Sequence, residues 1–144
     1  YELAYSYYAT ENYAKAIPGF KELGGKEDSL AQNSMYLLGD AYLRTNNKAN
    51  ARNAFLFCSQ NSSNLTQKEI SQFNYAKLSY ELGFQDIALN ECKQFINTYP
   101  RSTYQQEARE LLLLLLSNTN HFADALQLFA TLNSTNVSVQ KVYP

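Results

Sequence analysis

Residues 37–55 read LLGDAYLRTNNKANARNAF, and this stretch decides the fold of the chain. Before its central Thr-Asn-Asn, the small residue Gly39 and the aromatic residue Tyr42 are three positions apart. After it, Ala51 and Phe55 are four positions apart. Residues three or four apart lie on the same face of an α-helix, and a polar tripeptide containing two asparagines is typical of a turn. The stretch therefore predicts two helices joined by a tight turn.

The same arrangement recurs along the chain in four units. Alanines are spaced by 35, 37 and 37 residues, and an apolar residue follows each alanine by four and by seven positions. A small or apolar residue also precedes each alanine by twelve positions. In chain order the columns are Ala16, Ala51, Ala88 and Ala125; Phe20, Phe55, Cys92 and Phe129; Leu23, Cys58, Phe95 and Leu132; and Ala4, Gly39, Ala76 and Leu113. One helix pair cannot bury its apolar face alone, so such units are expected to stack.

The repeat predicts an all-α fold, a solenoid of eight helices in four antiparallel pairs without strands. The expected units are about 1–25, 30–60, 66–98 and 102–133, which together form a single helical-repeat domain. We expect the small residues to lie where the two helices of a pair approach closely. Large side chains such as Phe20, Phe55 and Phe129 are expected to fill the space between pairs. Leu113 breaks the small-residue column, and the run Leu111–Leu116 around it is expected to be buried on most sides.

Turn signals fall between the predicted helices. Within pairs they lie at 9–12, 45–47, Gly83 and 118–120, and between pairs at 24–25, 59–64 and 99–100. Thr66-Gln67-Lys68-Glu69 has the form of a capping box and predicts that it opens the fifth helix.

Composition argues against several classes of function. The 144 residues include 12 basic and 13 acidic side chains, a formal net charge of −1, which disfavours nucleic acid or an anionic membrane as a partner. The longest purely apolar run is the six leucines Leu111–Leu116, against the about 20 residues that cross a bilayer. We therefore expect no membrane insertion by this segment. Cys58 and Cys92 are interpreted as small buried apolar residues, with a disulfide as the alternative.

Catalytic and metal-binding motifs are not found. The one histidine, His121, lies at the predicted turn into the last helix, where a polar role at the helix start is the expectation. Glu107 and Glu110 are three positions apart on one helix face and are interpreted as a solvated face rather than an acid–base pair. No phosphate-binding, nucleophile or Cys-x-x-Cys motif is present. We expect no enzyme activity, no cofactor and no metal.

The repeated motifs resemble the tetratricopeptide repeat. The residues that carry the resemblance are Leu38-Gly39-x-x-Tyr42 with Ala51 and Phe55, Tyr13-x-x-Ala16-x-x-x-Phe20, Phe122-x-x-Ala125-x-x-x-Phe129, and Pro100 closing the third unit. The resemblance extends to about Leu132, although the aromatic residue expected early in each first helix is missing or altered. It implies a right-handed superhelix whose concave groove, lined by the first helix of each pair, binds a peptide, a tail or another domain.

The register of that resemblance implies a set of groove residues. They are Tyr5, Tyr8, Tyr36, Asp40, Arg44, Phe73, Lys77, Tyr80, Glu81 and Glu110, with Tyr1, Asn33, Leu43, Ile70, Glu107, Leu114, Ser117 and Asn118 in the same register. The aromatic members lie off the repeated core columns. They either present an interface, for which tyrosine is well suited, or pack against a neighbouring helix. Only Arg44 and Lys77 are basic, which makes a poor trap for a terminal carboxylate and suits an extended peptide or a neutral to basic helix.

The functional prediction is a protein–protein interaction scaffold. The alternatives are a structural spacer or oligomerisation segment of a longer solenoid, with end-to-end self-association, and a peptide-sensing regulatory domain. The chain opens without Met inside a helical pattern, so we interpret it as part of a longer protein, with 134–144 opening a further segment. Asp28-Ser29-Leu30 resembles an O-glycosylation signal of some Gram-negative bacteria. This favours a bacterial protein of the cell envelope, periplasmic or associated with the outer membrane, over a cytoplasmic one.

Overall fold

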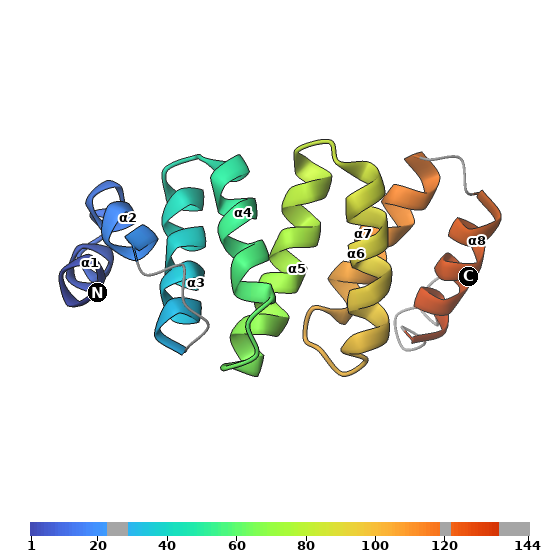
Figure 1. Cartoon of the computed structure of the whole chain (residues 1–144). Coiled ribbons are helices and arrows are strands. Elements are labelled where there is room, and N and C mark those ends of the chain that lie inside the picture. Colours follow the sequence, from blue (N-terminus) through green and yellow to red (C-terminus); the bar gives the residue numbers. More distant parts are fainter. Residues whose placement is uncertain (23–28, 119–121, 136–144) are drawn as a thin grey trace.

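The computed structural model describes residues 1–22, 29–118 and 122–135 as an array of α-helices. The helices are α1 (Glu2–Ala9), α2 (Tyr13–Glu22), α3 (Ser29–Arg44), α4 (Lys48–Ser59), α5 (Leu65–Glu81), α6 (Gln85–Thr98), α7 (Gln105–Asn118) and α8 (Phe122–Thr135). Each helix packs against the next one in the chain, and α3, α5 and α7 also touch in succession. The array runs from α1 and α2 at one end to α8 at the other (Figure 1). The predicted all-α solenoid of four helix pairs is confirmed for these residues.

Among residues 1–22, 29–118 and 122–135, no helix is both long enough and apolar enough to span a bilayer.

The turns inside the first three pairs share one backbone geometry. Glu11, Asn46 and Gly83 have φ values of 63°, 59° and 88°, in the left-handed region that favours glycine and asparagine. In each turn the next amide closes a ring onto the preceding helix, as in a Schellman motif. The bonds run from Asn12 N–H to Tyr7 O (2.7 Å), from Asn47 N–H to Tyr42 O (2.8 Å) and from Phe84 N–H to Ser79 O (2.8 Å). These turns lie where the sequence predicts them.

The repeated columns form the core between helices. Ala16, Ala51 and Ala88 are fully buried. Gly39 lies so close to α4 that a methyl group added to it would come within 2.7 Å of the Phe55 ring. Such contact leaves no space for a side chain, which is the close approach expected of this column.

The two cysteines belong to the same buried columns. Cys58 and Cys92 are free thiols and fully buried, as the interpretation of small apolar residues requires. Burial raises the pKa of the Cys58 thiol to about 11 and that of Cys92 to about 12.

Two sequence expectations about the later units are wrong. The N-cap of α5 is Asn64, whose side chain accepts a hydrogen bond from Gln67 N–H at 3.0 Å, so the box at Thr66 does not open the helix. Phe129 is 51% exposed, although its equivalent Phe55 is buried. Phe55 lies on α4, which packs between α3 and α5, whereas α8 is the last described helix and packs against α7.

The leucine run in α7 is buried on most sides, as the sequence predicts. Four of its members, Leu111, Leu112, Leu115 and Leu116, are buried. Leu113 is partly buried and Leu114 is half exposed. The exposed member, Leu114, lies on the side of α7 that adjoins α5.

The loops between pairs are held by side chains. The fully buried Gln32 of α3 donates from Nε2 to the carbonyl oxygens of Asn61 (2.5 Å) and Asn64 (3.0 Å), and its Oε1 accepts from Asn64 N–H (2.6 Å). The residue 37 positions later is Glu69 of α5, whose carboxylate accepts a hydrogen bond from Ser102 in the next loop at 3.1 Å. Each of these first helices therefore holds the loop that follows its own pair.

Candidate functional site

The predicted groove residues lie on α1, α3, α5 and α7, whose shared side we call the first-helix face. Between α1 and α3 this face is closed by its own side chains. Tyr8 donates from its hydroxyl to Asp40 at 2.6 Å, and Arg44 lies 3.5 Å from the same carboxylate oxygen. The Arg44 guanidinium also lies over the Tyr13 ring, 5.5 Å from its centroid. Burial and the neighbouring Asp40 carboxylate raise the pKa of Tyr8, so its proton stays in this network.

The aromatic candidates divide between packing and exposure. Phe73 is only 3% exposed and stacks on Tyr104 with ring centroids 4.8 Å apart, so it belongs to the core and is not accessible to a ligand. Tyr36 is partly buried, meets Phe55 edge-on, and has a pKa raised by burial. Tyr5 is exposed and stacks against Tyr1 at the end of the array. Of the two readings left open by the sequence, packing therefore holds for Phe73.

The open part of the first-helix face lies between α5 and α7. A pocket of about 210 Å³ is present there. Six of its seven lining residues belong to the predicted register, and the seventh is Leu111: Lys77, Tyr80, Glu81, Glu107, Glu110, Leu111 and Leu114. We call this the α5–α7 pocket. Because α5 and α7 belong to successive pairs, residues 30 positions apart in sequence, such as Lys77 and Glu107, meet at it.

The polar side chains of the α5–α7 pocket are partly paired. The Lys77 ammonium lies 3.2 Å from the Glu107 carboxylate, across the pocket. Glu81 pairs at 3.2 Å with Lys48, which comes from α4 and does not line the pocket. Both ion pairs are well exposed to solvent, so each is worth about 0–1 kcal/mol. They orient the side chains more than they stabilise the fold.

The floor of the pocket is apolar. Leu111 is buried against the core between α5 and α7, whereas Leu114 is 51% exposed. Tyr80 packs at the edge of the same core and is partly buried. Sequence reasoning missed Leu111, because the leucine run to which it belongs is expected to be buried and the pattern does not show that it also borders a pocket.

The sequence also offers a histidine and a segment that resembles a glycosylation signal as functional features. His121 and Asp28 lie outside the described residues. Within residues 1–22, 29–118 and 122–135, no three His, Cys, Asp or Glu side chains gather as ligands for a metal ion would.

Comparison with known proteins places this geometry in a class. The tetratricopeptide-repeat family profile matches residues 33–56. Two crystal structures of nearly identical TPR-like repeats from a candidate kinesin light chain of Podosopora anserina, one of them a point variant, resemble the fold. They superpose with TM-scores of 0.71 and 0.69 at 13% identity, over 95% of this chain and 73% of each of theirs. No curated protein sequence matches the chain.

The chain is therefore an α-solenoid of stacked helix pairs. Residues 33–56 match the tetratricopeptide-repeat profile, and the described helices share the fold of TPR-like repeats. The resemblance predicted from the sequence is confirmed. Repeats of this type generally mediate protein–protein interactions and are typically scaffolds without catalytic activity.

Proposed function

We propose that the chain is a non-enzymatic interaction scaffold that binds a peptide or partner domain on the first-helix face. The α5–α7 pocket carries the proposal, because it combines an exposed leucine with oriented charged side chains. Interfaces typically have such an apolar centre with a polar rim. The face between α1 and α3 contributes less to binding, since Tyr8, Asp40 and Arg44 already satisfy one another there.

The test replaces the exposed leucine of the pocket without touching the core. Leu114→Ser should abolish retention of a specific partner from an extract of the source cells, while circular dichroism stays unchanged. Leu65→Ser is the matched control, because Leu65 is an exposed leucine of α5 at the opposite end of that helix. Phe73→Ala is unsuitable, since removal of a buried aromatic side chain costs about 3–5 kcal/mol. A partner retained equally by Leu114→Ser, or no specific partner at all, would exclude binding at this pocket.

A structural spacer is the second candidate. It is favoured by the outer side of α8, where Leu126 and Phe129 are exposed. An additional helix of a longer solenoid, or a second copy of the chain in end-to-end association, would cover these side chains. Analytical ultracentrifugation of the wild type and of Leu126→Ser distinguishes this role, because self-association through α8 should weaken in the variant. A monomer at high concentration in both proteins would remove the support for self-association.

A further inference from the structure

The size of the α5–α7 pocket restricts what can occupy it. Its volume of about 210 Å³ is below the ~300–1,000 Å³ typical of small-molecule sites. It has room for one or two side chains of a larger partner rather than for a whole metabolite. The half-exposed Leu114 and the edge of Tyr80 offer the apolar surface for one of them.

The charge of the pocket restricts the partner further. Three carboxylates line it against one ammonium, which gives a net charge of −2. Lys77 is engaged by Glu107, and Glu81 is engaged by Lys48 from outside. Glu110 has only a neutral contact, an amide hydrogen bond of 3.3 Å from Gln106. Among the described side chains that line the pocket, Glu110 is the carboxylate without a cation.

We propose that the α5–α7 pocket selects a peptide in which a lysine or arginine lies next to an aliphatic residue. The aliphatic side chain packs on Leu114 and Tyr80, and the cation pairs with Glu110. This inference rests on the proposed function and adds the chemical character of the bound peptide. An acidic peptide is repelled by the same carboxylates, as are the phosphates of a nucleic acid.

The experiment uses a phage-displayed library of random twelve-residue peptides as the probe. The intact chain is the bait, at low ionic strength so that exposed charges are weakly screened. Selected peptides are then synthesised with a fluorophore, and their affinities are measured by anisotropy against the wild type and variants. We expect enrichment of peptides that place Lys or Arg beside Leu, Ile or Val.

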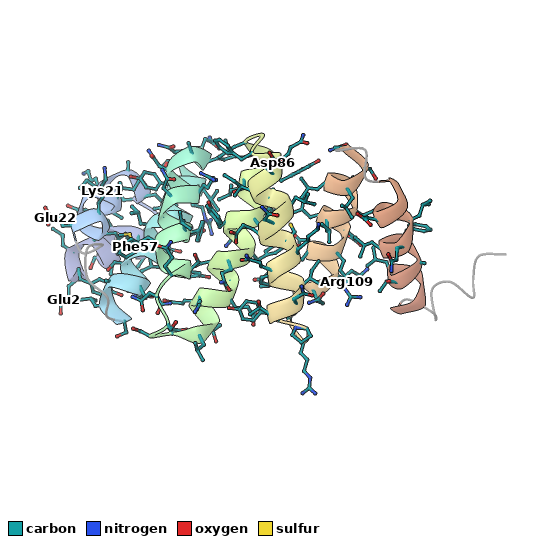
Figure 2. All side chains as sticks on the ribbon, turned by 45° about the vertical axis from the view of Figure 1, so that its right-hand side comes forward. Glu2, Lys21, Glu22, Phe57, Asp86 and Arg109 are labelled. Atoms are coloured by element: carbon teal, nitrogen blue, oxygen red, sulfur yellow. The ribbon has the colours of Figure 1, made fainter. Side chains whose placement is uncertain are left out.

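Two variants separate the charge contribution from the apolar one. Glu110→Gln should weaken these peptides about two- to fivefold, as expected for one exposed ion pair, and the loss should vanish at high salt. Leu114→Ser should weaken them irrespective of salt. Glu2→Gln, the matched control, changes the net charge equally but lies on α1 at the other end of the array (Figure 2), and should leave affinity unchanged.

The outcomes distinguish this inference from the proposed function. Basic–aliphatic peptides that depend on both Glu110 and Leu114 support both. Peptides that depend on Leu114 but show no basic preference, or no loss in Glu110→Gln, overturn the inference and leave the proposed function standing. A selection that yields no peptide dependent on Leu114 overturns both.

Discussion

The side chain of Gln32 is expected to be one of the strongest single supports of the stack. We predict the effect of Gln32→Met, which keeps the length of the side chain but removes its amide. The change eliminates three hydrogen bonds of 2.5–3.0 Å to the loop between α4 and α5. A buried polar group that loses its partner costs about 1–3 kcal/mol. Because Asn64 is exposed and can turn to water, we expect a net loss of about 2–4 kcal/mol rather than the full sum.

Two measurements test this prediction. Urea unfolding followed by circular dichroism gives the free energy of unfolding, and hydrogen exchange of the Asn64 amide, which donates to Gln32, reports on the loop alone. Gln94→Met is the matched control, because Gln94 is exposed on α6 and the same change there should stay within about 0.5 kcal/mol. If Gln32→Met were no more destabilising than Gln94→Met, and the Asn64 amide stayed protected, the proposed role of Gln32 would be refuted.

Three further predictions concern the turns, the core and the thiols. Glu11→Gly should raise the free energy of unfolding by up to about 1 kcal/mol in thermal or urea melts, because φ is 63° at this position and glycine adopts that conformation without strain. Gly83→Ala, at a φ of 88°, should lower the free energy of unfolding by a similar amount. A lower free energy of unfolding in Glu11→Gly would contradict the left-handed backbone at Glu11. Gly39→Ala should lower the free energy of unfolding by about 1–2 kcal/mol, because the added methyl group would press on the Phe55 ring. In a double-mutant cycle, Phe55→Leu should relieve part of that loss, and purely additive effects of the two changes would exclude the contact. The pKa of Cys58 is raised by burial from 9.0 to about 11, so the folded state favours the neutral thiol. Stability should be fully present below pH 9 and fall as the pH rises towards about 11. Urea melts at pH 8 and pH 10.5 should show a smaller drop in Cys58→Ala than in the wild type, and equal drops would argue against titration of this thiol.

The order and pairing of the helices could be predicted from the sequence. The columns through Ala51 and Phe55 have the helical period, and their recurrence determines which helices must stack. The prediction failed at Phe129, which is half exposed. Its column implies a further helix beyond it, and α8 is the last helix that the structure describes.

The candidate site was predictable in part. Register alone assigned Lys77, Tyr80, Glu81 and Glu110 to one face, and the structure places all four around one pocket. The register could not show that Phe73 is buried, because its burial depends on stacking with Tyr104 from the following pair. Nor could it show which carboxylates are engaged from other helices, because Tyr8 of α1 donates to Asp40 and Lys48 of α4 pairs with Glu81.

The loop contacts of Gln32 and Glu69 also define where this chain can be cut and recombined. In both pairs the contact joins a first helix to the loop after its own second helix. A segment exchanged between homologous chains keeps both sides of the contact only if it ends beyond that loop. The unit that can be shuffled, duplicated or deleted is therefore residues 29–64, which keeps both sides of the Gln32 contact together. A unit cut at the end of α4 would separate them.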